Sequence, residues 1–117
     1  MGRAIVVDDH PSFRASARRL LELSGYEVVG EAGDGASGLA LAREHEPELV
    51  LLDIALPDMS GFEVADELAG GASSVVFVSS RDQGDLGRRA RRSGALGFIP
   101  KDRLSEESLL AVVASAG

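Results

Sequence analysis

The chain has 117 residues, of which 44% are hydrophobic and only 4% aromatic, and its formal net charge is −7. This length fits one domain with an aliphatic core, so we expect residues 1–117 to form a single domain. The absence of cysteine excludes disulfides, thiolate metal sites and thiol nucleophiles, and the acidic balance argues against non-specific nucleic-acid binding. No apolar run resembles a signal peptide or reaches the length of a membrane span, so we expect a cytoplasmic protein without membrane contact.

The first third of the chain predicts a strand, a helix and a second strand. Residues 3–7 (RAIVV) form a short apolar run, and a helix is predicted to begin at Pro11, a favoured first helical position. This helix is expected to end at Ser24 and Gly25, and residues 26–32 (YEVVGEA) are the second strand. The inner face of the helix is formed by Phe13, Ala17, Leu20 and Leu21.

A second helix is predicted to start near Ala36 and to end before Pro47. Its inward-facing residues are expected to be Ala36, Leu39 and Ala40. The third strand, residues 48–54 (ELVLLDI), is nearly continuous in apolar residues, which is typical of strands buried on both faces of a parallel sheet.

The third helix opens with SGFE at residues 60–63, the spacing of a capping box, and is expected to bury Val64 and Leu68. Residues 74–79 (SVVFVS) form the fourth strand. Residues 81–94 (RDQGDLGRRARRSG) then predict a helix with a thin apolar face, formed by Leu86 and Ala90. Its glycines, Gly84 and Gly87, each cost about 1 kcal/mol of helix propensity relative to alanine, so we expect this helix to be the least stable.

Residues 95–99 (ALGFI) are the fifth strand, and the last helix is expected to begin after an N-cap at Ser105. The inner face of that helix is formed by Leu109, Val112 and Val113. Strands that alternate with helices at this spacing indicate right-handed βαβ crossovers. We therefore predict an α/β fold with a doubly wound, five-stranded parallel sheet and five helices.

Polar residues follow four of the predicted strands, at the edge where ligands bind in open parallel sheets. They are Asp8 and Asp9, Asp53, Ser79 and Lys101. Three carboxylates held together repel one another, which raises their pKa values unless a cation intervenes. A hard divalent ion with oxygen ligands, Mg²⁺, resolves this repulsion.

This set of residues predicts phosphoryl chemistry. A carboxylate beside Mg²⁺ can attack phosphorus and form an aspartyl phosphate. The metal and Lys101 would neutralise charge on the transferring group, and the Ser79 hydroxyl could donate to one of its oxygens.

Four segments resemble response-regulator receiver domains, in order and at normal spacing: VVDDHPSFR, LVLLDIALPDMSGFE, VVFVSS and GALGFIPKD. The first and last are most similar to the NarL/LuxR-type branch. The resemblance implies a CheY-like, flavodoxin-like sheet of strand order 2-1-3-4-5. Members of this branch usually have a C-terminal helix-turn-helix domain, so DNA would be bound only through an effector domain that these residues do not contain.

The resemblance implies that Asp53 is the phosphoacceptor. Asp9 would bind the Mg²⁺ ion directly and Asp8 largely through water, and the backbone carbonyl of Ala55 would complete the protein ligands. The donor would be a phosphohistidine of a sensor histidine kinase. The histidines of this chain, His10 and His45, are not expected to be that donor or to be catalytic.

The resemblance also implies a switch. Lys101 would pair with the phosphoryl group or with Asp53, Ser79 would be the switch hydroxyl, and Phe98 would change rotamer with it. The surface of the fourth helix, fifth strand and fifth helix would then control an output, transcription, and homodimerisation could follow activation. In many receivers Lys-Pro stands where this chain has Lys101-Asp102, which leaves open whether that peptide is cis.

Three alternatives stay open at lower weight. A phosphatase of the haloacid dehalogenase type also uses an aspartate nucleophile with Mg²⁺, but it needs a second aspartate two residues later, where this chain has Ala55. A receiver-like interaction module would not use phosphate at all. A flavodoxin-like cofactor binder would need a glycine-rich and hydroxyl-rich turn in place of Asp8 and Asp9.

The arginines of residues 81–92 outnumber their two aspartates and give this segment a net charge of +3. We expect Arg81 to face solvent rather than the phosphoryl pocket. The others are expected to form a solvated basic surface that pairs with acidic residues of a second subunit or an effector domain. Nucleic-acid binding is the less favoured use of this surface, which consists of Arg88, Arg89, Arg91 and Arg92.

Overall fold

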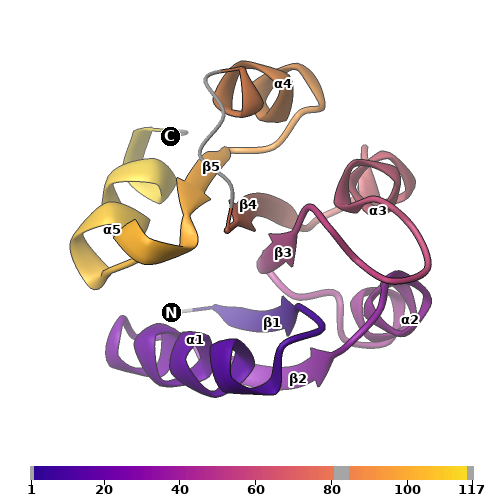
Figure 1. The fold of residues 1–117 in the computed structure, drawn as a ribbon. Helices are drawn as coiled ribbons and strands as arrows, with labels where there is room; N and C mark the ends of the chain where they lie inside the picture. The colour runs from indigo at the N-terminus through magenta and orange to yellow at the C-terminus, as the bar shows by residue number, and fades with distance from the viewer. Residues whose placement is uncertain (1, 81–84, 116–117) are drawn as a thin grey trace.

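The sheet has five parallel strands, and their spatial order is β2-β1-β3-β4-β5 (Figure 1). The structure is a computed structural model, and it describes residues 2–80 and 85–115. The strands are β1 (Arg3–Val7), β2 (Glu27–Ala32), β3 (Leu49–Asp53), β4 (Ser74–Ser79) and β5 (Gly97–Pro100). Both the predicted class and the predicted strand order are confirmed.

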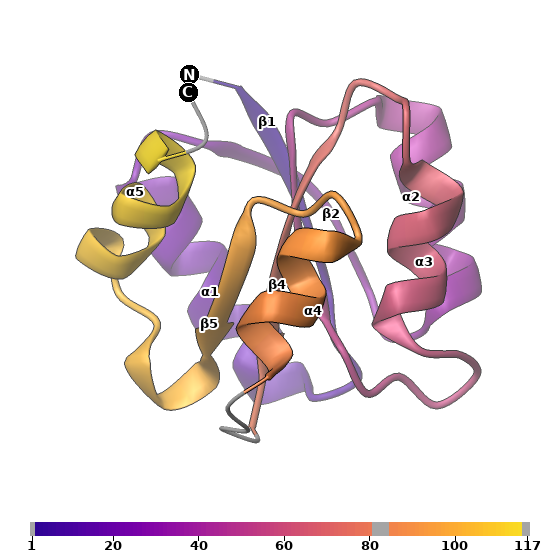
Figure 2. The same ribbon diagram turned by 90° about the horizontal axis from the view of Figure 1, so that it is seen from above.

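Helices cover both faces of this sheet. They are α1 (Pro11–Leu23), α2 (Gly35–His45), α3 (Gly61–Leu68), α4 (Leu86–Arg92) and α5 (Glu106–Ser115), and a 3₁₀ turn spans Lys101–Arg103. Figure 2 shows α1 and α5 on one side of the sheet and α2 and α3 on the other. Within the described part of the chain, no helix combines the length and the hydropathy needed to cross a membrane.

Two apolar clusters form the core, one on each face of the sheet. Successive strand residues point to opposite faces, so Val50 and Leu52 pack with α2, α3 and α4, whereas Leu49 and Leu51 pack with α1 and α5. All four side chains are at most 1% exposed. The continuous apolar runs of the sequence therefore form strands buried on both faces, as predicted.

The residues that helix α2 buries differ from those predicted from the sequence. Ala36 and Ala40 are exposed, and the buried residues of this helix are Gly35, Gly38, Leu39 and Ala42. Gly38 faces β1 so closely that an added Cβ would lie 2.8 Å from a methyl carbon of Val7. The helix therefore packs against the sheet through a glycine, which a search for large apolar residues does not find.

The start of α2 is capped from two places in the sequence. Asp34 is its N-cap and accepts a hydrogen bond from the backbone N–H of Ser37 at 2.7 Å. Asp58, from the loop between β3 and α3, accepts hydrogen bonds from the N–H groups of Gly35 (2.7 Å) and Ala36 (3.0 Å). These N–H groups hold the pKa of the Asp58 carboxyl below its usual value. The contact joins the loop after Asp53 to a neighbouring helix.

Three other predicted helix signals are confirmed, whereas Leu68 of α3, which was expected to be buried, is half-buried. The capping box of α3 is present at Ser60 and Glu63, and Ser105 accepts a hydrogen bond from the Ser108 N–H at 3.1 Å just before α5. The buried residues of α4 are Leu86 and Ala90. The predictions for Arg81 and Gly84 lie outside the described residues.

The last strand begins two residues later than predicted. Ala95 donates its N–H to the carbonyl of Ala90 at 3.2 Å, so it still belongs to the turn that ends α4. Leu96 donates its N–H to the carbonyl of Val75 in β4 at 2.8 Å, and the strand register begins at Gly97, opposite Val76.

Candidate functional site

The predicted site residues meet at the edge formed by the carboxyl ends of the strands. Asp8 directly follows β1 and is fully buried, while Asp53 ends β3 and is 3% exposed. Ser79 ends β4 and is also buried, and Lys101 directly follows β5. In the sheet register Asp53 lies opposite Val78 and Ser79 lies opposite Pro100. The parallel topology thus brings together residues that are far apart in the chain.

The ammonium group of Lys101 lies between two carboxylates. Its Nζ atom is 2.6 Å from Asp8 Oδ2 and 3.5 Å from Asp53 Oδ2. The sequence interpretation paired Lys101 with Asp53 or with the phosphoryl group, but the shorter ion pair is with Asp8. The same Nζ atom also lies over the ring of Phe13, 4.5 Å from its centroid, so the ammonium group contacts α1 as well.

Asp53 is a carboxyl group with a perturbed acidity. Its pKa is raised from 3.8 to about 6, chiefly by burial and next by the negative charge of Asp8. Lys101 and the backbone N–H of Ala55, which donates to Asp53 Oδ1 at 3.3 Å, oppose this shift. The site therefore holds a buried carboxylate that is mostly ionised at neutral pH and only partly neutralised by the protein.

The donor atoms present fit a divalent cation. Asp8, Asp9, His10 and Asp53 each offer one potential ligand atom, and these four atoms lie within 4.8 Å of one another. Asp8 Oδ2 is buried and, among the described residues, receives no hydrogen bond; its contact with Lys101 is an ion pair. A group of carboxylate oxygens this close together is a natural ligand set for a hard ion such as Mg²⁺.

The proposed switch residues lie on the two strands nearest α4. Ser79 is 5% exposed, and Phe98 of β5 lies opposite Phe77 and packs, half-buried, against the cluster beneath α3 and α4. Ala55 forms an isolated bridge with Ser60. Among the described residues no peptide bond is cis, so the Lys101–Asp102 peptide is trans.

Three residues that the sequence interpretation left outside the site belong to its surroundings. Arg14 donates from Nη1 to the backbone carbonyl of Asp8 at 2.7 Å, and Phe13 lies beneath Lys101. His10 contacts both Asp8 and Asp9 through its Nδ1 atom, at 3.1 and 3.2 Å. All three lie at the start of α1 or just before it, so their proximity to Asp8 and Asp9 in the sequence was the available signal.

Of two surface pockets, one adjoins this site and the other lies at the opposite edge of the sheet. A pocket of about 270 Å³ adjoins the site, and the lining residues are Ile54, Ala55, Ser60, Phe62, Ser79, Ser80, Leu86 and Arg89. The guanidinium of Arg89 lies over the Phe62 ring, 4.2 Å from its centroid, and so links α4 to α3.

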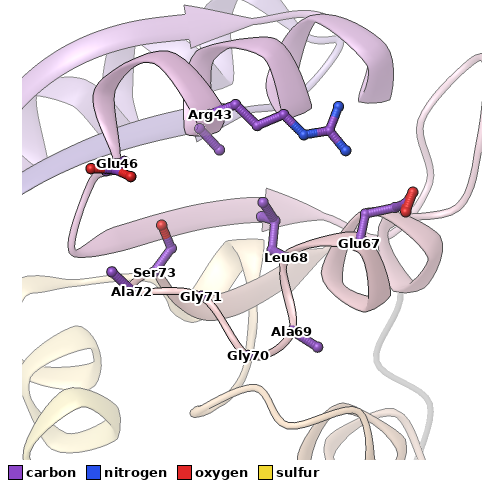
Figure 3. A pocket seen from close by; sticks show the side chains of 10 residues that line it. Arg43, Glu46, Glu67, Leu68, Ala69, Gly70, Gly71, Ala72 and Ser73 are labelled. Atoms are coloured by element: carbon purple, nitrogen blue, oxygen red, sulfur yellow. The ribbon is translucent and has the colours of Figure 1, made fainter.

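Figure 3 shows a second pocket of about 330 Å³, between the end of α2 and the loop that follows α3. It lies at the opposite edge of the sheet, because Ser73 in its lining precedes β4. Its charged lining residues, Arg43, Glu46 and Glu67, are all exposed. This pocket is therefore separate from the carboxylates and holds no comparable buried group.

Comparison with known proteins points to one family. The family model described as response regulator receiver domain matches residues 4–114. The probable transcriptional regulatory protein NarL of Mycobacterium tuberculosis is 40% identical over 114 residues, which cover 95% of this chain and 53% of that protein.

Solved structures agree with this similarity. The signal receiver domain of NarL from M. tuberculosis has a TM-score of 0.86 at 37% identity, covering 98% of this chain and 94% of that one. A two-component response regulator of the LuxR family from Aurantimonas sp. SI85-9A1 has a TM-score of 0.87 at 30% identity, covering 99% and 84%. The chain spans about half the length of the curated relatives it matches.

Proposed function

This chain belongs to the response regulator receiver family of two-component systems, in its NarL/LuxR-type branch, and from that premise we propose that Asp53 is its phosphoacceptor. The observation that supports this assignment is the buried carboxyl of Asp53 at the end of β3, with Asp8 and Lys101 beside it. We place the whole receiver unit at residues 1–117.

In the transfer step, a carboxylate oxygen of Asp53 attacks the phosphorus of a phosphohistidine on a sensor histidine kinase. The new O–P bond forms as the P–N bond breaks, and the leaving imidazole keeps the electron pair of that bond. The Lys101 ammonium and the Ala55 N–H already lie next to Asp53 oxygens, where negative charge on the transferring group would be stabilised. When bound, Mg²⁺ would add positive charge at this point, held by Asp8, Asp9, Asp53 and the carbonyl of Ala55.

The signal then passes through Ser79 and Phe98. The Ser79 hydroxyl donates to the phosphoryl group, and the ring of Phe98 repacks toward the space that the hydroxyl leaves, shifting the α4–β5–α5 surface. NarL of M. tuberculosis, named above, is described as a probable transcriptional regulatory protein, and the chain covers about half its length. This supports an output in transcription, through a DNA-binding domain outside this chain, with homodimerisation as the step that follows activation.

The protein acts in the cytoplasm and catalyses no reaction beyond its own phosphorylation and dephosphorylation. Its partners are a kinase on the input side and an effector domain on the output side. The buried position of Asp53 supports signalling to an effector domain. A phosphoryl group attached there changes the packing of neighbouring strands rather than an exposed surface.

Phosphotransfer to Asp53 is tested by intact-mass spectrometry after incubation with acetyl phosphate and Mg²⁺. We expect the wild type to gain one phosphoryl group and Asp53→Asn to gain none. Asp66→Asn, which makes the same change on the exposed side of α3, is the matched control and should label like the wild type. Equal labelling of Asp53→Asn and wild type would refute the assignment.

A further inference from the structure

His10 has an unusual position for an exposed loop residue. Its side chain is 62% exposed, yet the ring nitrogen Nδ1 lies 3.1 Å from Asp8 Oδ1 and 3.2 Å from Asp9 Oδ1. Pro11 follows it, which favours extended backbone at the preceding residue, and His10 has φ −98° and ψ 110°. Its ring makes no capping hydrogen bond to α1, so the ring faces the carboxylates rather than the helix end.

The spacing of these atoms matches ligands that share one ion. In an octahedral site with bonds of about 2.1 Å, neighbouring ligand atoms lie roughly 3.0 Å apart. Nδ1 of His10 has almost this distance to one oxygen of Asp8 and to one oxygen of Asp9. Asp53 contributes a further donor atom, and all four atoms lie within 4.8 Å of one another.

A positively charged group already lies beside these donor atoms. The Lys101 ammonium is 2.6 Å from Asp8 Oδ2 and 3.4 Å from His10 Nδ1. Asp8 Oδ2 is buried and, within the described ranges, accepts no hydrogen bond. The carboxylates and the imidazole therefore converge on a place that favours a cation, and one donor there is nitrogen rather than oxygen.

We infer that His10 Nδ1 is a direct ligand of the divalent ion at this site, so that the site binds imidazole-preferring ions such as Zn²⁺ and Co²⁺ in addition to Mg²⁺. Imidazole suits these transition metals, whereas sites made of oxygen alone suit Mg²⁺. The inference deepens the proposed function, because it rests on the divalent-ion site formed by Asp8, Asp9 and Asp53. It assigns His10, the residue just before α1, a role in the choice of metal.

The direct test is long-range ¹H–¹⁵N NMR of the full chain labelled with ¹⁵N-histidine. The sequence contains two histidines, His10 and His45, so their rings can be assigned with one variant of each. On addition of Zn²⁺ we expect the Nδ1 signal of His10 to move to a metal-bound position while His45 is unchanged. A Nδ1 that stays a protonated hydrogen-bond donor to Asp8 and Asp9 in the Zn²⁺-bound protein overturns the inference.

Calorimetric titration provides the second measurement. We expect His10→Phe to weaken Zn²⁺ binding by at least the roughly 10-fold that loss of even an outer-shell partner causes, and to change Mg²⁺ binding less. The matched control His45→Phe should leave both affinities unchanged, and Mg²⁺ should compete with Zn²⁺ in the wild type. Equal weakening of both ions, or absence of competition, contradicts direct ligation at this site.

The outcomes also separate this inference from the proposed function. If both ions bind and compete but His10 Nδ1 is not a ligand, the carboxylate site and the role of Asp53 stand and the inference fails. If neither ion binds the wild type, the divalent-ion site itself is wrong, and acetyl phosphate labelling in the presence of Mg²⁺ should fail as well.

Discussion

Asp53 is a residue whose place in the core costs stability. Its pKa is raised from 3.8 to about 6, chiefly by burial. A carboxyl group with a raised pKa in the folded state lowers stability as pH rises from its unfolded pKa to its folded pKa, and the cost is constant above that window. Without divalent ions, we expect Asp53→Asn to raise the free energy of unfolding at pH 8 by about 1–2 kcal/mol, after allowance for solvent screening, and to have little effect near pH 4.

Urea unfolding at the two pH values, in the presence of a chelator, measures this difference. Asp66→Asn, the same change at an exposed position of α3, is the matched control. Addition of Mg²⁺ should stabilise the wild type and have less effect on Asp53→Asn, since a ligand that binds the folded state raises its stability. If Asp53→Asn were less stable than the wild type at pH 8, interactions in the fold would fully compensate the cost of burying the Asp53 carboxylate.

Among the helices, α2 and α4 each contain a glycine, but the two glycines have opposite surroundings: the one in α2 is tightly packed and the one in α4 is not. A Cβ at Gly38 of α2 would lie 2.8 Å from Val7, whose side chain is fully buried in β1. A Cβ at Gly87 of α4 would meet nothing within 4 Å. Since alanine favours helix over glycine by about 1 kcal/mol and overpacking costs about 1–3 kcal/mol, the same substitution should have opposite effects at the two positions.

We expect Gly38→Ala to lower the free energy of unfolding by about 1–2 kcal/mol and Gly87→Ala to raise it by up to about 1 kcal/mol. Thermal unfolding of the two variants beside the wild type measures both changes, and each variant is the control for the other. Stabilisation by Gly38→Ala would show that α2 can move away from the sheet without loss. No gain in stability from Gly87→Ala would mean that helix propensity does not limit the stability of α4.

On the scale of the whole molecule, the charge is divided between a basic helix and an acidic remainder. The net charge is −7, yet α4 contains four arginines, and all four are exposed. Opposite charges on two copies would steer such surfaces together. If activated copies associate through this surface, reversing Arg88 and Arg92 to Glu should abolish the increase in apparent mass that beryllofluoride and Mg²⁺ cause in the wild type.

Size-exclusion chromatography with light scattering measures this association, and acetyl phosphate labelling of Asp53 should continue in the variant. The control replaces Arg19 of α1 and Arg43 of α2 by Glu, which makes the same change in net charge at exposed positions away from α4. If the control loses association to the same degree, total charge rather than the α4 surface is responsible. If neither variant changes it, the arginines of α4 only contribute to solubility.

Local patterns in the sequence were sufficient to predict the α/β class, the strands apart from the bounds of β5, and the edge of the sheet at which the site lies. Each of these depends on local information: continuous apolar runs, the capping box at Ser60, and polar residues directly after strands. Because parallel strands end at a common edge, locating Asp8, Asp53 and Lys101 after strands was sufficient to predict that they meet. The resemblance of four segments to receiver domains then agreed with the family that the comparisons show.

The contacts between these elements follow from tertiary packing and could not be predicted from the sequence. Helix α2 has small residues on several sides, so its periodicity did not distinguish Ala36 and Ala40 from Gly38 and Ala42, and the fit of Gly38 against Val7 made the choice. The preference of Lys101 for Asp8 depends on side-chain directions at the ends of separate strands. Such directions follow from packing between segments distant in the chain, such as Phe13 beneath Lys101, and no local pattern of residues contains them.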